Sequence, residues 1–599
     1  MNNVNVLSEA HAKGSDPVTT DDVNQWFHEF NQWLITKASG SSCKLAQTGL
    51  FLQDAHWRDI VAFGRVIDTC SGLEEMNQKW SETQPHKKAA NFHIDTKREP
   101  IRWVKRAGRD VLEVIAAFEL DGGSGEAVLR FILENDQLRA WTIMTALAQL
   151  DDITPNTEPD QQRNDPYARD FTGPNWLDER KKSAAYEQHE PTVLIVGGGH
   201  AGLTAAAQLG NLGIDCLVVD RMERIGDNWR KRYHTLSLHN QKDSNHLPFL
   251  PFPKTWPLYI PKDKIANWLE FYVEAMEINF WTRTDFLGAK RLDHDQKWEV
   301  QLRTKDGNIR HMYPRHVIMA TSVSNKPKIP SLPGLDSFEG DVLHSSQFHD
   351  AERYRDKSVL VMGTGTSSHD ISQELHGHGA HVTMIQRSPT LITNVEPSAQ
   401  LYDSLLLTPG PSLEDRDILA IATPLKPMIE MHKLITAESK KLDKELLEGL
   451  EKVGFRLYFG PDDTGWPLLY RNRGGGYYFN IGCSELLING EIKLMASQDI
   501  EAFIPKGLKM TNGDEKTAEL LVLATGYEGP ESMVLDLFGP DVAKKVGKIW
   551  GFGNRQELSN MWTRTAQEGL WFTAGAFSQC RQFSKYLALQ IAQDELARS

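Results

Sequence analysis

One stretch, Thr192–Asp220, constrains the fold of this chain more than any other. It opens with a short apolar and β-branched run, Thr192–Val196, that predicts one buried parallel strand. Glycines with the spacing G-x-G-x-x-G follow: Gly197, Gly199 and Gly202. A predicted helix, Leu203–Leu212, and a predicted strand, Ile214–Val219, come next, and Asp220 ends that strand. This order predicts a Rossmann-like β-α-β unit that binds a dinucleotide.

Each glycine has its own physical task in such a unit. Gly197 permits the tight turn, Gly199 lets the backbone approach a pyrophosphate, and Gly202 lets the helix pack closely on the strand. The helix N-terminus adds unpaired N–H groups and the positive end of its dipole, both of which favour phosphate. Asp220 lies about 20 residues beyond Gly199, where a carboxylate is expected to bind a ribose hydroxyl.

A second β-α-β pattern occupies Lys357–Arg387. Its predicted phosphate-binding residues are Gly363, Gly365, Thr366, Ser367 and Ser368, the last in place of a third glycine. With serine there, we expect slightly looser packing of helix on strand. The second strand ends in Arg387 and Ser388 rather than in an acid. A guanidinium and a hydroxyl suit a 2′-phosphate, which a carboxylate would repel, so this unit favours NADPH over NADH. The alternative is an arginine that is merely exposed at a strand end.

Length, charge and cysteine usage exclude several classes of function. The 599 residues suffice for about two to four domains. The formal net charge of −14 argues against nucleic acid or an anionic membrane as the main partner. The five cysteines lie far apart without a C-x-x-C, which argues against a disulfide framework, a zinc site and a dithiol redox centre. With neither an apolar leader nor an apolar run of about 18 residues, we expect a cytoplasmic protein without a membrane anchor.

The chain has two dinucleotide units, and the second strand of the first unit ends in an acid, Asp220. This order indicates a flavoprotein that takes hydride from a nicotinamide. Between them lies a run that fits F-x-G-x-x-x-H-x-x-x-[YF] through Phe338, Gly340, His344 and Phe348. Together with Ala524-Thr525-Gly526, this run resembles the signatures of the flavin-containing monooxygenases. The resemblance covers about residue 191 to the C-terminus. It implies FAD in the first unit, with Trp229, Thr525 and Gly526 also near it, NADPH in the second unit, and no metal.

The residues before the first unit indicate a separate α+β domain. An amphipathic helix pattern from Thr20 is followed by three consecutive strand patterns that end near Leu150. This part resembles the cone-shaped ketosteroid-isomerase-like, or nuclear-transport-factor-like, fold, which precedes the monooxygenase in a fungal and bacterial subgroup. The linker sequence GPNWL fits that subgroup. We favour a structural role for this domain in packing or in a homodimer over a role in ligand binding.

The expected fold class is therefore α/β, with two Rossmann-like dinucleotide-binding domains preceded by the α+β cone. The expected segments, in chain order, are a disordered N-terminus (1–16), the α+β domain (17–150), a linker (151–190), the first part of the FAD-binding domain (191–350), the NADPH-binding domain (351–515) with a helical insertion (403–455), and the second part of the FAD-binding domain (516–599).

The family resemblance also implies a mechanism. NADPH reduces FAD, reduced FAD captures dioxygen, and the resulting C4a-(hydro)peroxyflavin oxygenates a small organic substrate. The chain's task is to keep water away from that intermediate. The resemblance implies that Asn240 hydrogen-bonds the peroxide or the retained nicotinamide, with His239 as the alternative at the same place. His344 is expected to couple the two domains.

Three activities remain open from the sequence. The first is oxygenation of an amine, a sulfide or a 2-oxo acid. The second is Baeyer–Villiger oxygenation of a ketone, which Phe348 disfavours because dedicated Baeyer–Villiger enzymes carry tryptophan there. The third is an NADPH oxidase or a non-catalytic flavin-binding scaffold.

Overall fold

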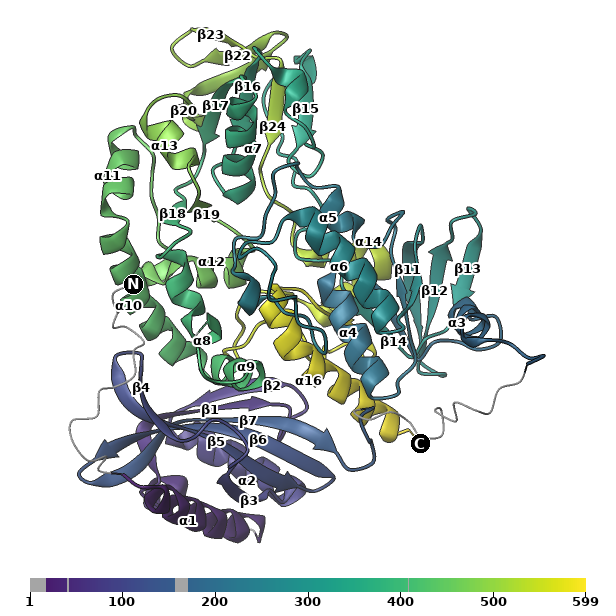
Figure 1. Ribbon diagram of the computed structural model, residues 1–599, viewed down its shortest axis with the longest axis vertical. Coiled ribbons are helices and arrows are strands. Elements are labelled where there is room, and N and C mark those ends of the chain that lie inside the picture. The colour runs from purple at the N-terminus through teal and green to yellow at the C-terminus, as the bar shows by residue number, and fades with distance from the viewer. Residues whose placement is uncertain (1–17, 40–42, 157–170, 408, 599) are drawn as a thin grey trace.

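The computed structural model describes residues 18–39, 43–156, 171–407 and 409–598. Our expectation of disorder for residues 1–16 lies outside these ranges, as does part of the expected linker. Three large sheets organise the described chain: an amino-terminal mixed sheet and two parallel five-stranded sheets. Figure 1 shows the amino-terminal sheet at one end of the molecule and the second parallel sheet at the other.

The amino-terminal sheet has the order β2-β1-β7-β6-β5-β3, with β4 paired to β5. Its strands are β1 (Phe51–Ile60), β2 (Ile67–Ser71), β3 (Ala90–Ile94), β4 (Arg102–Arg106), β5 (Arg109–Leu120), β6 (Gly123–Glu134) and β7 (Gln137–Leu150). The three consecutive antiparallel strands that the sequence predicts are β5, β6 and β7. Helices α1 (Thr20–Ala38) and α2 (Leu73–Lys87) cover one face of this sheet. Helix α1 starts with a capping box, in which the Thr19 hydroxyl accepts from Asp22 N and the Asp22 carboxylate accepts from Thr19 N.

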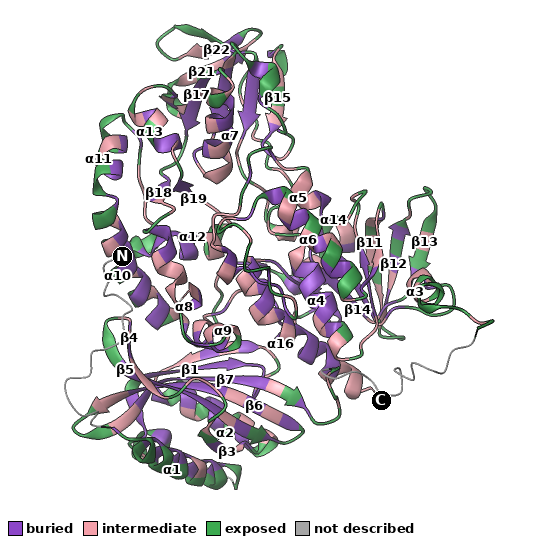
Figure 2. Cartoon of the chain, viewed as in Figure 1, coloured by how far each residue is buried: buried purple, intermediate pink, exposed green. Residues whose placement is uncertain are grey.

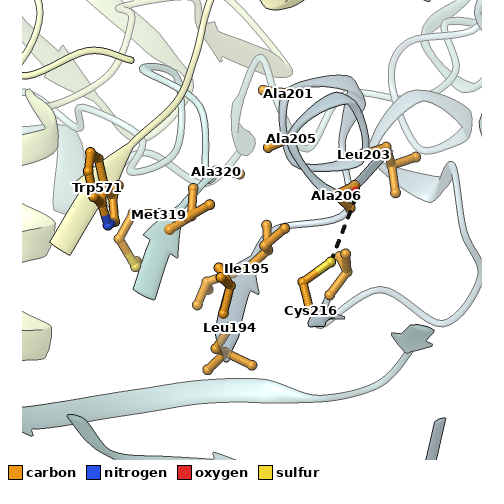
Figure 3. Packing of buried hydrophobic residues seen from close by; sticks show 14 of the residues in the cluster. Leu194, Ile195, Ala201, Leu203, Ala205, Ala206, Cys216, Met319, Ala320 and Trp571 are labelled. Carbon is orange, nitrogen blue, oxygen red and sulfur yellow. Dashed lines mark hydrogen bonds between the residues drawn. The ribbon is translucent and has the colours of Figure 1, made fainter. Parts of the chain in front are cut away.

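The first parallel sheet contains the first glycine motif. Its order is β10-β9-β8-β14-β25, and its strands are β8 (Val193–Val196), β9 (Cys216–Val219), β10 (Asn279–Trp281), β14 (His316–Met319) and β25 (Leu570–Phe572). Every pairing in it is parallel. Helix α4 (His200–Asn211) packs its small residues on this sheet, as the alanines in Figure 3 show. The Cys216 thiol contacts the Ala206 carbonyl of α4 at 3.8 Å.

The second parallel sheet contains the second glycine motif. Its order is β15-β24-β16-β17-β20, and its strands are β15 (Asp341–His344), β16 (Ser358–Met362), β17 (His381–Gln386), β20 (Lys493–Ala496) and β24 (Leu520–Leu523). Helix α7 (Thr366–Gly377) connects β16 to β17, and α13 (Cys483–Ile488) precedes β20.

Two strands of this sheet, β15 and β24, fall within the segments that the sequence assigns to the FAD-binding domain. We assigned β15 and β24 to the two parts of the FAD-binding domain, 191–350 and 516–599. In the structure, β24 pairs with β15 on one edge and with β16 on the other, so both strands belong to the second sheet. Neither four-residue strand carries a local signal that selects one parallel sheet over the other. β24 is apolar and suits any buried strand, and β15 begins with an acid and is only partly buried.

Helices and small sheets complete the fold. The remaining helices are α3 (Trp176–Ala185), α5 (Asp227–Arg230), α6 (Lys262–Ala275), α8 (Ser404–Leu407), α9 (Leu413–Ile421), α10 (Leu425–Leu442), α11 (Lys444–Lys452), α12 (Gly465–Arg473), α14 (Pro530–Phe538), α15 (Pro540–Val546) and α16 (Phe577–Leu596). The remaining strands are β11 (Asp285–Leu292), β12 (Lys297–Arg303), β13 (Ile309–Met312), β18 (Leu391–Asn394), β19 (Tyr477–Asn480), β21 (Ile500–Ile504), β22 (Gly507–Met510) and β23 (Glu515–Thr517).

The amino-terminal sheet packs against the rest of the chain through its second face. Residues Ile418 and Leu419 of α9 and Leu589 of α16 belong to the same apolar core cluster as the sheet. Figure 2 shows buried residues along β1 and β7, where α9 and α16 lie over the sheet. Arg130, which is fully buried, donates to the Leu419 carbonyl and to the Thr423 hydroxyl. The face of the cone is therefore covered by the helical insertion and by the C-terminal helix.

Candidate cofactor and substrate site

A single large cavity of about 1870 Å³ lies where the parallel sheets, the helical insertion and the amino-terminal sheet meet. Ligand pockets in proteins are usually about 300–1,000 Å³, so this cavity has room for more than one ligand. Both glycine turns open onto it. The predicted site residues that line it are Gly197, Gly199, Asp220, Trp229, His239, Asn240, Gly363, Gly365, Thr366, Ser367, Ser368, Arg387, Ser388, Thr525 and Gly526.

The first glycine turn leaves its backbone open towards the cavity at Gly199. Gly197 has φ +109°, and a Cβ there would lie 2.5 Å from the Ala320 carbonyl oxygen. A Cβ on Gly202 would lie 2.1 Å from the Gly197 carbonyl oxygen, so this position is closely packed. Gly199 is the N-cap of α4, and a Cβ there would meet only the Asn228 side-chain nitrogen, at 3.1 Å. The space before the helix N-terminus therefore fits a phosphate group.

Asp220 lies at the cavity wall with its carboxylate held in place. One carboxylate oxygen accepts from Gly198 N at 2.6 Å, and the other accepts from Met222 N at 2.8 Å. Each oxygen retains a lone pair for a further donor, such as a ribose hydroxyl. Beside this turn, the Trp229 ring packs against Phe577 with a centroid separation of 5.7 Å.

The second turn has the same geometry with one chemical difference. Gly363 has φ +125°, and a Cβ there would lie 2.3 Å from the Ala524 carbonyl oxygen. At Gly365 a Cβ would have no neighbour closer than the Tyr477 carbonyl oxygen, at 3.8 Å. Ser368, in the place of the third glycine, donates its hydroxyl to the Gly363 carbonyl. The hydrogen bond allows the serine to fit where we expected looser packing.

Arg387 and Ser388 follow β17 and are exposed at the cavity edge. The Arg387 carbonyl accepts from Arg456 Nη2 at 2.7 Å, which fixes the backbone at this point. Within the described part of the chain, no carboxylate lies within ion-pairing distance of the Arg387 guanidinium. It is therefore available to an anionic ligand.

The fingerprint residues lie outside the cavity and hold the second sheet together. Phe338 is buried beside Phe503, Phe348 is buried in a neighbouring core cluster, and a Cβ on Gly340 would lie 2.5 Å from the Phe338 ring. His344 Nε2 donates to the Gly526 carbonyl at 3.0 Å. That same carbonyl accepts from Lys328 N. His344 therefore links two strand ends of the second sheet to the segment that arrives from the first sheet.

His239 and Asn240, our alternatives for one role, are adjacent on the cavity wall. The Asn240 side chain donates from Nδ2 to Asp403 at 2.7 Å. Its carbonyl oxygen and its second N–H have no partner among the described residues. Burial raises the pKa of Asp403 to about 6. The His239 ring packs edge-on against Phe479 at 4.6 Å, and burial lowers the pKa of His239 to about 4. At pH 7 the imidazole is therefore neutral.

Several cavity residues were not predicted from the sequence. Arg58 and Ile67 come from the amino-terminal sheet, although we expected that domain to be only structural. Arg58 makes two hydrogen bonds to Glu557, at 2.8 and 2.6 Å, and Glu557 also lines the cavity. The helical insertion and α12 add Asp403, Met428, His432 and Arg471. Arg471 is the first residue of the glycine-rich stretch RNRGGGYY, a pattern that indicates a tight loop but no particular site residue.

The described residues also bear on metal binding, disulfides and membrane insertion. Within the described residues, no three His, Cys, Asp or Glu side chains are grouped to hold a metal ion. Cys70, Cys216, Cys483 and Cys580 are free thiols. Among the described helices, none combines the length and apolar character needed to span a bilayer.

Comparisons with known proteins match the central part of the chain. A family model described as pyridine nucleotide-disulphide oxidoreductase matches residues 194–404. The indole-3-pyruvate monooxygenase YUCCA1 of Oryza sativa subsp. japonica is 28% identical over 356 residues, which are 59% of this chain and 80% of that protein. A probable indole-3-pyruvate monooxygenase of Arabidopsis thaliana, YUCCA10, is 28% identical over 57% of this chain and 82% of its own length.

Solved structures share the fold. Cyclohexanone monooxygenase from Rhodococcus sp. Phi1 bound to NADP⁺ has a TM-score of 0.50 at 18% identity, over 68% of this chain and 85% of that chain. The open crystal structure of a cyclohexanone monooxygenase has a TM-score of 0.51 at 16% identity, over 67% of this chain and 88% of that chain.

Proposed function

We propose that this chain, which belongs to the flavin-containing monooxygenase family, is an NADPH-dependent enzyme that oxygenates a small organic substrate. The observation that carries the proposal is that two glycine turns, one followed by an acid and one by an arginine, open onto one cavity. Two cofactors held this way meet inside the protein, where hydride can pass between them. A cytoplasmic location, where NADPH is supplied, goes with this proposal.

The residues present fit the two cofactors. Around the first turn, the open backbone at Gly199, the start of α4 and the Asp220 carboxylate would hold the pyrophosphate and ribose of FAD. Around the second, Thr366, Ser367 and the exposed pair Arg387 and Ser388 would hold NADPH. When bound, FAD accepts hydride from NADPH and, once reduced, activates dioxygen.

The chain's own contribution is to exclude water and to orient hydrogen bonds. Asn240 is fixed by its bond to Asp403, so its free amide groups can position the reacting oxygen or the nicotinamide. The His239 ring is neutral at pH 7, so it carries no acidic imidazolium proton. Placing fixed dipoles where water is absent makes each of them more effective than in bulk solvent.

The substrate class in this proposal is an amine, a sulfide or a 2-oxo acid. The 2-oxo acid has support from the relatives, which are named for indole-3-pyruvate. Ketone oxygenation and simple NADPH oxidation are the competing outcomes of the test below.

The test starts from the purified full-length protein. We expect it to be yellow, to contain FAD, and to consume NADPH and dioxygen. NADPH consumption minus hydrogen peroxide release, measured with a thioether, a tertiary amine, an aromatic 2-oxo acid and a cyclic ketone, identifies the oxygenated class. Absence of FAD after reconstitution would refute the proposal. Stoichiometric peroxide with every substrate would identify an oxidase, and oxygenation of the ketone alone would identify a Baeyer–Villiger enzyme.

Asn240→Ala tests which of the two adjacent side chains protects the oxygenation step. We expect the fraction of NADPH lost as hydrogen peroxide to rise about tenfold, because one oriented hydrogen-bonding group is removed. Flavin reduction by NADPH should change by less than about twofold, as measured by anaerobic stopped-flow absorbance. The comparison variant is His239→Phe, which keeps a ring against Phe479. If only His239→Phe raises the peroxide fraction, the role belongs to His239.

A further inference from the structure

Arg471 is a cation on the cavity wall that forms no ion pair with any described residue. It lies near the C-terminal end of α12 and is half-buried. In the described part of the chain, its guanidinium makes one hydrogen bond, from Nη1 to the Met428 sulfur at 2.7 Å. A thioether is a weak acceptor, so the remaining N–H groups of the guanidinium have no strong acceptor.

The two carboxylates whose charges act on Arg471 already accept hydrogen bonds from other residues. Asp403 accepts from Asn240, and Glu557 accepts from both Arg58 and Thr69. Neither lies within ion-pairing distance of Arg471, although both raise its pKa by attraction. Burial, and then the like charge of Arg58, lower the pKa of Arg471 to about 10, so it remains a cation at pH 7. A charge withdrawn from water without a partner is costly, and an anion from solution would offset that cost.

Apolar side chains line the same cavity as Arg471. Arg471 contacts Met428 of α10, and Met431 of the same helix and the Trp466 ring of α12 also line the cavity. Trp466 packs against Tyr477 with a centroid separation of 5.6 Å, which makes an aromatic wall. Thioether and aromatic side chains suit the apolar body of a small molecule. The cavity therefore combines the Arg471 guanidinium with apolar and aromatic side chains.

Arg471 is also close to the reacting position of the proposed function. Asp403 accepts a hydrogen bond from Asn240, and the charge of Arg471, which lines the same cavity, lowers the pKa of Asp403. An anion bound to Arg471 would therefore lie near the groups that we propose to orient the reaction. The phosphates of both cofactors are expected elsewhere, at the two glycine turns and at Arg387.

We propose that Arg471 binds the carboxylate of the substrate, so that this enzyme oxygenates small organic acids with an apolar or aromatic body. This inference rests on the proposed function and names the substrate class of the same cavity. A guanidinium can bind a carboxylate through two parallel hydrogen bonds, which fixes the orientation of the acid as well as its charge.

The test measures binding rather than turnover. The probes are 3-phenylpropionate and its neutral amide, 3-phenylpropanamide, which have the same apolar body. Each is titrated into the FAD-loaded full-length protein without NADPH, and affinity is read by calorimetry and by tryptophan fluorescence. We expect the wild-type protein to prefer the carboxylate by about tenfold or more.

Substitutions separate the charge from its geometry. Arg471→Met should weaken carboxylate binding by about tenfold to a hundredfold and leave amide binding unchanged. Arg471→Lys should keep part of the preference, because it keeps the charge but loses the two-pronged geometry. Arg139→Met is the matched control: Arg139 pairs with Glu134 at the β6–β7 turn, outside the cavity, and its loss should change neither affinity.

Equal affinity of the wild-type protein for acid and amide would overturn the inference, as would an unchanged preference in Arg471→Met. If Arg471→Met does not fold or loses FAD, Arg471→Lys decides: a fully retained preference with unchanged affinities overturns the two-pronged assignment. Because no NADPH is present, a preference for the acid stands even if the protein never oxygenates a substrate, so failure of the proposed function is seen separately.

Discussion

Replacing Gly199 by valine is expected to give a folded protein that does not retain FAD, whereas valine at Gly365 should leave FAD bound and remove NADPH binding. Both glycines have ordinary φ values, −79° and −87°, so a side chain causes no backbone strain. At Gly199 a Cβ meets only the Asn228 side chain, and at Gly365 its closest neighbour is 3.8 Å away. The added methyl groups would instead occupy the space in front of the helix N-terminus, where a pyrophosphate is expected.

Each variant has its own measurement. For Gly199→Val, the FAD content after dialysis and the affinity on reconstitution should fall at least about a hundredfold, roughly 2.8 kcal/mol. For Gly365→Val, the FAD content should equal that of the wild type. The NADPH concentration that half-saturates flavin reduction should then rise about a hundredfold.

Gly210→Val is the control for the first substitution. Gly210 lies in the same helix as the first turn, and no atom lies within 4 Å of a Cβ built there. We expect unchanged FAD content and a thermal midpoint that is equal or slightly higher, since valine forms helices better than glycine. Loss of FAD in Gly365→Val, or retained FAD in Gly199→Val, would show that the two turns are assigned to the wrong cofactors.

The local parts of the site could be predicted because their signals lie within short stretches of sequence. A strand, a glycine turn and a helix are adjacent in the chain, so the spacing of Gly197, Gly199 and Gly202 already specifies the turn geometry. The same reasoning identified the second unit, including Arg387 at its strand end. The α/β fold class follows from the repetition of these units.

Contacts between distant residues could not be predicted in this way. Arg58 and Glu557 form a buried ion pair although nearly the whole chain separates them. An arginine inside a strand pattern is no more conspicuous than one on a solvent-exposed face. For the same reason, the assignment of β24 to the second sheet and the position of Arg471 on the cavity wall required the three-dimensional structure.

The hydroxyl of Ser368 bears on the prediction that helix and strand pack more loosely in the second unit. The third glycine of the G-x-G-x-x-G motif is explained by the close packing of the helix on the strand, which leaves no space for a side chain. The structure shows that a hydroxyl at this position donates to the Gly363 carbonyl, a contact that no rule about residue size includes. Serine therefore satisfies a backbone acceptor at the point where glycine would only avoid a clash.

Arg387→Ala is expected to make the enzyme indifferent to the 2′-phosphate of its nicotinamide substrate. The KM for NADPH should rise about thirtyfold to a hundredfold, because a charge-assisted contact with phosphate is lost. The KM for NADH should change by less than about twofold. Since the contact is made equally in the ground and transition states, kcat with NADPH should stay near its wild-type value. Arg387 is exposed, so the thermal midpoint should not change.

Two further variants define what the Arg387 result means. Arg353→Ala removes another arginine from the NADPH-binding part, one that pairs with Asp341 outside the cavity. It should leave both KM values unchanged and so excludes a general effect of net charge. Ser388→Ala removes a neutral hydroxyl from the same strand end, and we expect only about a threefold to tenfold rise in the KM for NADPH. If Arg387→Ala raised both KM values equally, the guanidinium would contact a group that the two nucleotides share, and the selectivity for NADPH would have to come from another cation on the cavity wall.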